Sequence, residues 1–128
     1  MKKSGLINVE LCAAIARLGH TDTFVVADCG LPVPASVPVI DLAVTVGTPG
    51  FAEVLEPLLG EVVVEAAVIA SEARGTSTER LVRDLLECPL TDVAHEEFKR
   101  LLPETSFVVR TGSNVPYANV LLRSGVPF

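Results

Sequence analysis

The sequence predicts an α/β fold, a three-layer helix–sheet–helix sandwich around a mostly parallel, mixed central sheet. Largely apolar runs at 24–27 and 61–70 are typical of strands that are covered on both faces. Segments with apolar residues at helical spacing alternate with these runs along the chain. A chain of 128 residues has room for one core, so residues 1–128 are expected to form a single domain.

The predicted elements alternate along the chain. The first helix has Asn8 as its N-cap and stops at Gly19, a usual residue for a helix end. The loop at 31–34 contains two prolines, which cannot lie in a helix or an inner strand. Further helices are predicted at 51–59, between 76 and 89, and after residue 94. Strands are predicted at 24–27, 39–44, 61–70, 107–110 and 119–122, with a short strand or link at 90–91.

Three local signals refine the predicted helix ends. Thr76 and Glu79 have the spacing of a capping box, in which each side chain binds the other residue's backbone N–H. Ala94 precedes the last helix, although alanine is a poor N-cap. Pro57 lies within the apolar pattern of the helix at 51–59 and removes one hydrogen bond. We therefore expect that helix to bend or to end early.

Composition restricts the partners and the compartment. The net charge is −6 and the ten Lys and Arg residues are scattered, which argues against nucleic-acid binding. Hydrophobic residues make up 49% of this small chain, so some apolar surface is expected in a subunit interface. Three cysteines without a Cys-x-x-Cys pair fit a reducing compartment. No stretch resembles a signal peptide or a membrane span, so we expect a cytoplasmic protein away from membranes.

Polar residues stand at both ends of the strand predicted at 24–27. His20 follows the helix-ending glycine, where an imidazole can give and take a proton near neutrality. It could equally be an ordinary turn histidine near a helix C-terminus. Asp22 fits an ordinary turn aspartate better than a group that orients His20. Asp28 ends the strand, where its carboxylate needs donors from a ligand or from the loop at 30–33.

A second polar group lies in the C-terminal part of the chain. His95 falls in the first turn of a predicted helix, where the dipole disfavours a positive imidazole. Its residue type alone favours an exposed helix histidine over a binding group. Tyr117 and Asn119 flank one residue and would point to the same side of a strand beginning there, an arrangement that suits a polyol. Turn chemistry around Pro116 is the alternative.

The remaining polar residues predict no cofactor. Cys29 adjoins Asp28, and the neighbouring carboxylate would disfavour a nucleophilic thiolate. Two histidines without His-x-x-x-His spacing predict no metal site, and no glycine-rich phosphate motif predicts a nucleotide. Ligands of such sandwiches sit beyond the carboxyl ends of the strands. We therefore expect Asp28 and the loop at 112–117 to face one rim of the sheet.

Four sets of residues, in the same order along the chain, resemble the D-ribose pyranase family, bacterial ribose-operon proteins related to the fucose mutarotases. The similarity runs from Lys2 to Phe128, and four motifs in register are a specific signal where each alone is weak. They are Leu-Gly-His-Thr-Asp at 18–22, Val-Val-Ala-Asp-Cys-Gly-Leu-Pro-Val-Pro at 25–34, His-Glu-Glu-Phe-Lys at 95–99, and Val-Arg-Thr-Gly at 109–112 with Pro-Tyr-Ala-Asn at 116–119.

The resemblance implies an isomerase that interconverts the β-pyranose and β-furanose forms of D-ribose without cofactor or metal. By that similarity His20 would be the proton donor, and Asp28, His95, Tyr117 and Asn119 would bind the sugar. The resemblance also implies a cytoplasmic homo-oligomer, commonly a decamer of stacked pentamers, with sites near subunit boundaries.

This chain departs from the family pattern beside His95. The segment at 73–93 is shorter than in typical members, and Ala94 stands where Ser or Thr usually caps the helix; Cys29 replaces a usual alanine. Two other functions stay open: a fucose-type mutarotase that acts on anomers, and a non-catalytic sugar-binding partner of a transport system. The Leu-Pro-Val-Pro loop at 31–34 and Val-Pro-Tyr-Ala-Asn at 115–119 favour the ribose branch.

Overall fold

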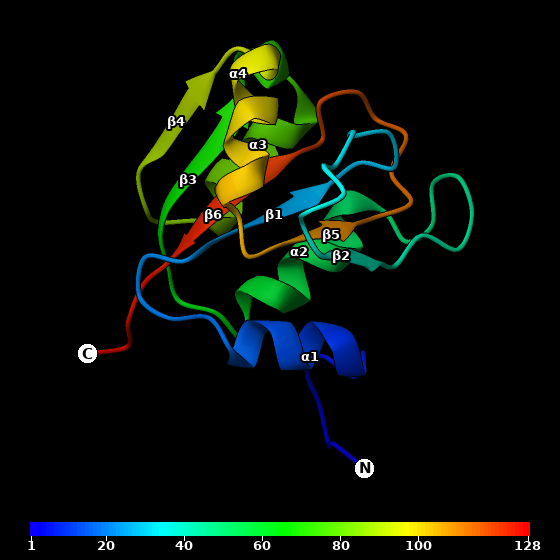
Figure 1. Ribbon diagram of the computed structural model, residues 1–128, viewed down its shortest axis with the longest axis vertical. Coiled ribbons are helices and arrows are strands. Elements are labelled where there is room, and N and C mark those ends of the chain that lie inside the picture. Colours follow the sequence, from blue (N-terminus) through cyan, green and yellow to red (C-terminus); the bar gives the residue numbers. More distant parts are fainter.

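A single six-stranded sheet forms the centre of the computed structural model, which describes residues 1–128 (Figure 1). The strands are β1 (Thr23–Ala27), β2 (Val39–Asp41), β3 (Val64–Ala70), β4 (Leu90–Val93), β5 (Phe107–Arg110) and β6 (Val120–Ser124). They pair in the order β2-β5-β1-β6-β3-β4. Only β6 is antiparallel to its neighbours, β1 and β3, and the other pairs are parallel. The mostly parallel, mixed sheet predicted from the sequence is confirmed.

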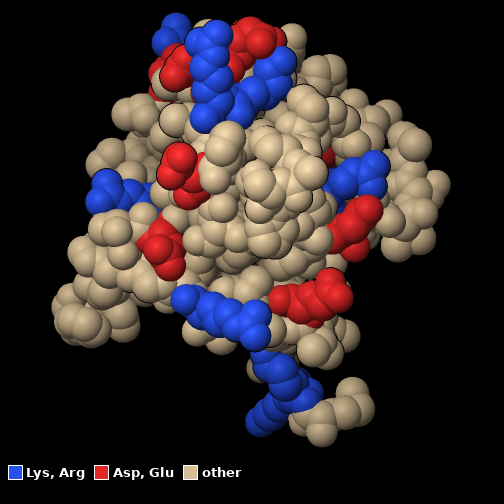
Figure 2. All heavy atoms as spheres, in the orientation of Figure 1, with Lys and Arg blue, Asp and Glu red and all other residues tan.

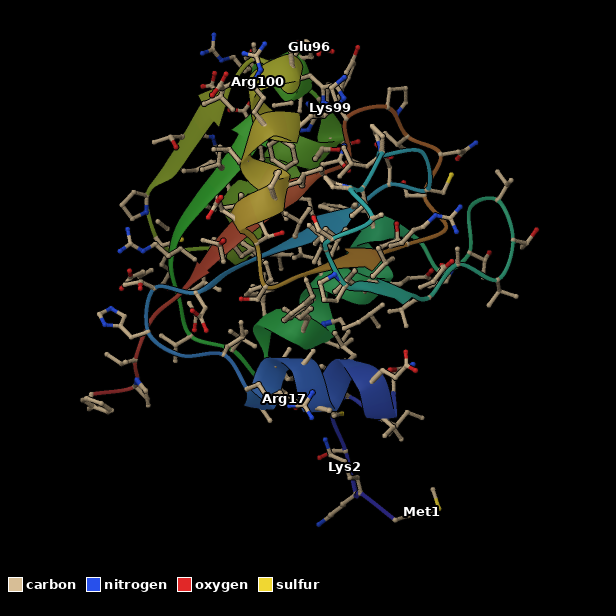
Figure 3. The ribbon with its side chains drawn as sticks, in the orientation of Figure 1. Met1, Lys2, Arg17, Glu96, Lys99 and Arg100 are labelled. Carbon is tan, nitrogen blue, oxygen red and sulfur yellow. The ribbon has the colours of Figure 1, made fainter.

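Helices cover both faces of this sheet. They are α1 (Val9–Ala16), α2 (Phe51–Leu59), α3 (Ser77–Leu85) and α4 (His95–Leu101), with short 3-10 turns η1 (Ser71–Ala73) and η2 (Leu102–Glu104). In Figure 1, α4 passes in front of the sheet, while α2 and α3 lie behind it. The labelled charged residues of α4, Glu96, Lys99 and Arg100, lie on the outside of the molecule (Figure 3). No helix is long and apolar enough to span a bilayer.

Strand β1 is buried on both faces, which explains why its apolar run is continuous. Phe24 and Val26 belong to a cluster of 18 buried residues that also contains residues of α1, α2 and α3. Val25 and Ala27 belong to a separate cluster of eight, which contains Phe98 of α4. Alternate side chains of a strand point to opposite faces, so β1 contributes to both cores. The helix–sheet–helix sandwich follows from this two-sided burial.

Two of the strand boundaries that differ from the sequence prediction lie beside a carboxylate that binds a backbone N–H group. The strand expected at 39–44 ends at Asp41, whose Oδ1 accepts a hydrogen bond of 3.0 Å from the backbone N–H of Ala43 and turns the chain. The strand expected from residue 61 begins at Val64. Glu61 instead accepts a 2.6 Å hydrogen bond from the backbone N–H of Leu6, far away in sequence.

The predicted capping box of α3 is wrong. Thr76 is the N-cap residue, but its hydroxyl donates to the carbonyl oxygen of Ala73 and makes no bond to the helix. Glu79 accepts from the backbone N–H of Gly75, at 2.7 Å, one residue before the expected partner. The nearby Ala73 carbonyl competes successfully for the threonine hydroxyl, as short polar side chains often bind local backbone outside helices.

Helix α2 keeps its predicted range and contains Pro57 in its last turn. It ends at Leu59 and is followed by Gly60, so the missing proline donor falls close to the helix end. The buried face of α2, which includes Leu55 and Leu58, packs on the sheet. Tertiary packing therefore tolerates the proline there.

Gly112 lies where two loops make their closest approach. Its N–H donates to the carbonyl oxygen of Pro49 at 2.8 Å, and its own carbonyl oxygen accepts from Gly47 at 2.5 Å. A Cβ atom at this position would collide with the backbone carbonyls of Thr45 and Thr48. Only glycine fits this contact without moving one of the loops.

We predict that Gly112→Ala destabilises the protein, because the added methyl group overpacks two backbone carbonyls. Overpacking of this kind costs about 1–3 kcal/mol in the free energy of unfolding. Urea titration followed by circular dichroism measures it. Gly19→Ala is the matched control, because its added Cβ would come no closer than 3.5 Å to Asp22. Equal midpoints for the two variants would contradict the prediction.

Candidate functional site

The rim at the carboxyl ends of the parallel strands is built around the end of β1. The β5–β6 loop at 111–119 crosses this end and is tied to it. Both the backbone N–H and the hydroxyl of Thr111 donate to the carbonyl oxygen of Ala27, at 2.9 and 2.8 Å. The N–H of Cys29 donates to the carbonyl oxygen of Ser113 at 2.8 Å. These bonds bring Asp28 and the loop to the same rim.

Asp28 and Asn119 are joined by two hydrogen bonds. The backbone N–H of Asp28 donates to Oδ1 of Asn119, and Nδ2 of Asn119 donates to Oδ2 of Asp28, each at 2.9 Å. The other carboxylate oxygen, Oδ1, accepts from the N–H of Gly30 at 2.9 Å. Asn119 is fully buried, whereas Asp28 is half-buried. The carboxylate thus fixes the loop, which was one of its two possible roles.

The environment of the Asp28 carboxylate contains no cation. Its two donors, Nδ2 of Asn119 and the backbone N–H of Gly30, are both neutral, so its charge is not cancelled by an ion pair. Arg110 on the neighbouring strand β5 is occupied elsewhere, with Asp41 at 2.8 Å and the carbonyl oxygen of Cys29 at 3.1 Å. A carboxylate has about four acceptor sites, so capacity remains for ligand hydroxyl groups.

Tyr117 stands in a strained turn at the same rim. Its φ of 61° lies in the left-handed region, which costs a non-glycine residue of order 1 kcal/mol or more. Strand β6 begins only at Val120, so Tyr117 and Asn119 do not share a strand face. Tyr117 is 36% exposed, and its ring makes an edge-to-face contact with His95, at a centroid distance of 5.1 Å.

His95 is the first residue of α4, and it is half-buried instead of being the exposed helix histidine that its residue type favours. Its Nδ1 atom is buried and has no hydrogen-bond partner. Buried polar atoms in native proteins are almost always paired. An unpaired nitrogen at the rim therefore points to a partner that arrives with a ligand or with water.

Glu72 supplies the N-cap that Ala94 lacks. The Ala94 side chain makes no capping bond, and the Glu72 carboxylate accepts the backbone N–H of His95, at 2.9 and 3.1 Å to its two oxygens. Hydrogen bonds from the backbone N–H groups of Glu72 and His95 lower the pKa of the Glu72 carboxyl. The poor cap signalled that another acceptor was needed, but its position 23 residues away could not be read from the sequence.

His20 precedes β1 in the chain and so lies at the opposite end of this strand from the other four predicted residues. The five residues of β1 separate it from Asp28, a span of about 16 Å for a strand. Its side chain is 54% exposed, and its Nε2 lies 2.9 Å from Oε2 of Glu65 on β3. Asp22 does not orient it and instead accepts from the N–H of Gly19 at 2.8 Å, as an ordinary turn aspartate.

Four predicted site residues thus gather at one rim within the chain, as two contacting pairs, and His20 does not join them. Sequence reasoning missed Glu72 and Glu65, the partners of the two histidines. No three His, Cys, Asp or Glu side chains converge as a metal site would require. A cavity of about 570 Å³ is lined by the start of α2, by α3 and by residues 113–115 and 118 of the β5–β6 loop, and a second of about 560 Å³ lies between α1 and β2. None of the five predicted site residues lines either cavity.

The chain belongs to the RbsD / FucU transport protein family, whose model matches residues 1–127. It is 61% identical over 128 residues to a D-ribose pyranase of Cutibacterium acnes and 54% identical to one of Corynebacterium glutamicum, covering 100% of both chains in each case. The family resemblance of the sequence motifs is confirmed over the full length.

Solved structures share the same architecture. Bacillus subtilis RbsD complexed with D-ribose is 40% identical, with a TM-score of 0.94 over 100% of both chains. The fucose mutarotase of Streptococcus pneumoniae, solved with L-fucose, has a TM-score of 0.78 over 95% of both chains. Its 20% identity supports the shared fold alone.

We predict that Glu72→Gln weakens the N-terminus of α4 in a pH-dependent manner. Because the folded-state pKa of Glu72 lies below its ordinary value of 4.5, its carboxylate stabilises the fold above that value. The contribution is lost as the pH falls through the folded-state pKa. Urea unfolding at neutral pH should show wild type as more stable than the variant, and the difference should shrink in acid. A difference independent of pH, or an equal loss in the exposed control Glu56→Gln, would contradict this.

Proposed function

We propose that this protein interconverts the β-pyranose and β-furanose forms of D-ribose by general acid–base ring opening and reclosure. The observation that carries the proposal is full-length similarity to proteins named D-ribose pyranase, at 61% and 54% identity. The 40% identical Bacillus subtilis RbsD, whose structure superposes over the whole chain, was solved with D-ribose. The rim of Asp28, His95, Tyr117 and Asn119 provides a polar surface for a monosaccharide.

Interconversion of the two ring forms requires only proton transfers by correctly positioned groups. Ring opening protonates the ring oxygen and removes the proton from the anomeric hydroxyl, which gives the open-chain aldehyde. Reclosure through a different hydroxyl reverses these transfers and leaves the atom count unchanged. No electron sink or strong nucleophile is needed, and positioned acid–base groups typically supply about 10²–10⁴-fold. Neutral donors and one carboxylate are sufficient for such a site.

The five residues have separate roles in this proposal. His20 is the proton donor to the ring oxygen. Asp28 accepts hydrogen bonds from sugar hydroxyl groups, and the fully buried Asn119 contributes to binding by holding Asp28 in place. The unpaired Nδ1 of His95 and the exposed part of Tyr117 complete the binding surface. A sugar hydroxyl would satisfy the buried His95 nitrogen.

The separation of His20 from the rim implies that two copies of the chain form each site. A homo-oligomer, which we propose to be a decamer of stacked pentamers in the cytoplasm, would place His20 of one copy at the rim of the next. Half of the His20 side chain is exposed and available for this contact. The view in Figure 2 shows a broad uncharged centre with charged residues around it. Large apolar side chains are also exposed elsewhere, among them Ile7, Val9, Val44 and Val46.

We predict that the protein accelerates exchange between the ring forms of D-ribose, and that His20→Ala abolishes this acceleration. Saturation-transfer NMR on ribose and fucose with added protein measures it, and sedimentation checks that the variant still assembles. Acceleration of fucose anomers alone would assign the protein to the fucose-type mutarotases. Unchanged activity in His20→Ala would remove the histidine from the mechanism. Ribose binding without any acceleration by wild type would favour the transport-partner function.

We predict further that two inactive variants restore activity when they share an oligomer. His20→Ala supplies an intact rim, and Asp28→Asn supplies an intact imidazole from the neighbouring copy. Subunits exchanged under mild denaturant should regain a fraction of the wild-type exchange rate, while either variant alone stays inactive. Mixing without subunit exchange is the control. A mixed oligomer that stays as inactive as its parents would place His20 and Asp28 of one chain in the same site.

A further inference from the structure

Glu65 connects His20 to Arg123 at the end of the sheet that lies opposite the rim. Its Oε2 lies 2.9 Å from Nε2 of His20, and its Oε1 lies 2.8 Å from Nε of Arg123. Glu65 is on β3 and Arg123 is on β6, which pairs with both β1 and β3. Two neighbouring strands, β3 and β6, therefore contribute to one chain of contacts that ends at the imidazole in the turn before β1.

The direction of each hydrogen bond follows from the groups involved. An ionised carboxylate only accepts hydrogen bonds, and an arginine side chain only donates them. With Glu65 ionised, Nε2 of His20 must carry the hydrogen in this contact. Nδ1 of His20 makes no hydrogen bond to the protein, and the Asp22 carboxylate in the same turn is occupied by the N–H of Gly19. In the neutral ring, Nδ1 is then the nitrogen with a free lone pair.

We propose that Glu65 is the positioning residue of His20: it holds Nε2–H and makes Nδ1 the nitrogen that exchanges a proton with the sugar. The imidazolium gives its Nδ1 proton to the ring oxygen and becomes the neutral Nε2–H ring, whose Nδ1 takes the proton back on reclosure. This inference rests on the proposed function for its catalytic part. Arg123 holds the second carboxylate oxygen, so that Glu65 cannot turn away from the imidazole. Orientation of a catalytic histidine by a carboxylate on its other nitrogen is a general device of acid–base catalysis.

The variant Glu65→Gln tests the tautomer directly, because Arg123 dictates how the new amide is oriented. Arginine has no acceptor, so the amide oxygen faces Arg123 and the amide NH2 group faces His20. Nε2 must then accept, which moves the ring hydrogen to Nδ1. The shape of the side chain is unchanged, and a partly exposed ion pair contributes little to stability, so the variant should fold.

Nitrogen-15 NMR of the His20 ring distinguishes the two tautomers. Wild type at a pH where the ring is neutral should show mainly the Nε2–H form, and Glu65→Gln should show mainly Nδ1–H. Glu87→Gln is the matched control, since Glu87 is exposed, accepts no hydrogen bond and changes the charge equally. A wild-type spectrum dominated by Nδ1–H would overturn the assignment without reference to any variant.

Kinetics of ribose exchange tests the catalytic part. Glu65→Gln should lower kcat about 10- to 100-fold with KM changed less than about twofold. Nε2 must accept from the amide in this variant, so the ring cannot form the imidazolium that donates from Nδ1, while the rim stays intact. Glu87→Gln should retain the wild-type kcat. Equal kcat values for wild type and Glu65→Gln would overturn the positioning role. An absence of acceleration by wild type would instead contradict the proposed function, and the NMR result would still decide the tautomer.

Discussion

The two hydrogen bonds between Asp28 and Asn119 are the constraint on which the site depends. They join the end of β1 to the residue before β6, the one strand that runs against its neighbours. Asn119 has no exposed surface, so its amide must satisfy both its donor and its acceptor within the protein. A backbone N–H on one side and a carboxylate on the other achieve this in a single orientation. The β5–β6 loop is consequently held at both of its ends.

This constraint explains how the rim holds a carboxylate in place without a cation beside it. The Asp28 carboxylate accepts from one side-chain amide and one backbone N–H group, while Arg110 pairs with Asp41. An arginine beside the carboxylate would fill its acceptor sites with strong donors and compete with sugar hydroxyl groups. Neutral donors hold the carboxylate in place and leave lone pairs free. The unpaired Nδ1 of His95 adds a second unfilled position at the same rim.

The sequence predicted the elements better than the contacts between them. The apolar run of β1 and the apolar face of α2 are strong local patterns, and both were placed correctly. Glu72 and Glu65 were missed because they meet their histidines across 23 and 45 residues, through a turn after β3 and through the pairing of β6 with β3. The capping box at Thr76 failed for the opposite reason, since a nearer carbonyl captured the hydroxyl.

Strand β6 carries or adjoins a residue that holds a carboxylate at each of its two ends. Asn119, just before it, holds the binding carboxylate, and Arg123, near its end, holds the carboxylate that contacts His20. Asn119 and Arg123 therefore lie at opposite ends of β6, beside the two ends of the antiparallel strand β1. In the proposed oligomer, each copy would then present a complete binding rim and, about a strand length away, a complete proton donor. The proton donor could not reach the binding rim of its own copy, so catalysis would require the oligomer. Assembly would then bring a reacting group into each site as well as bury apolar surface.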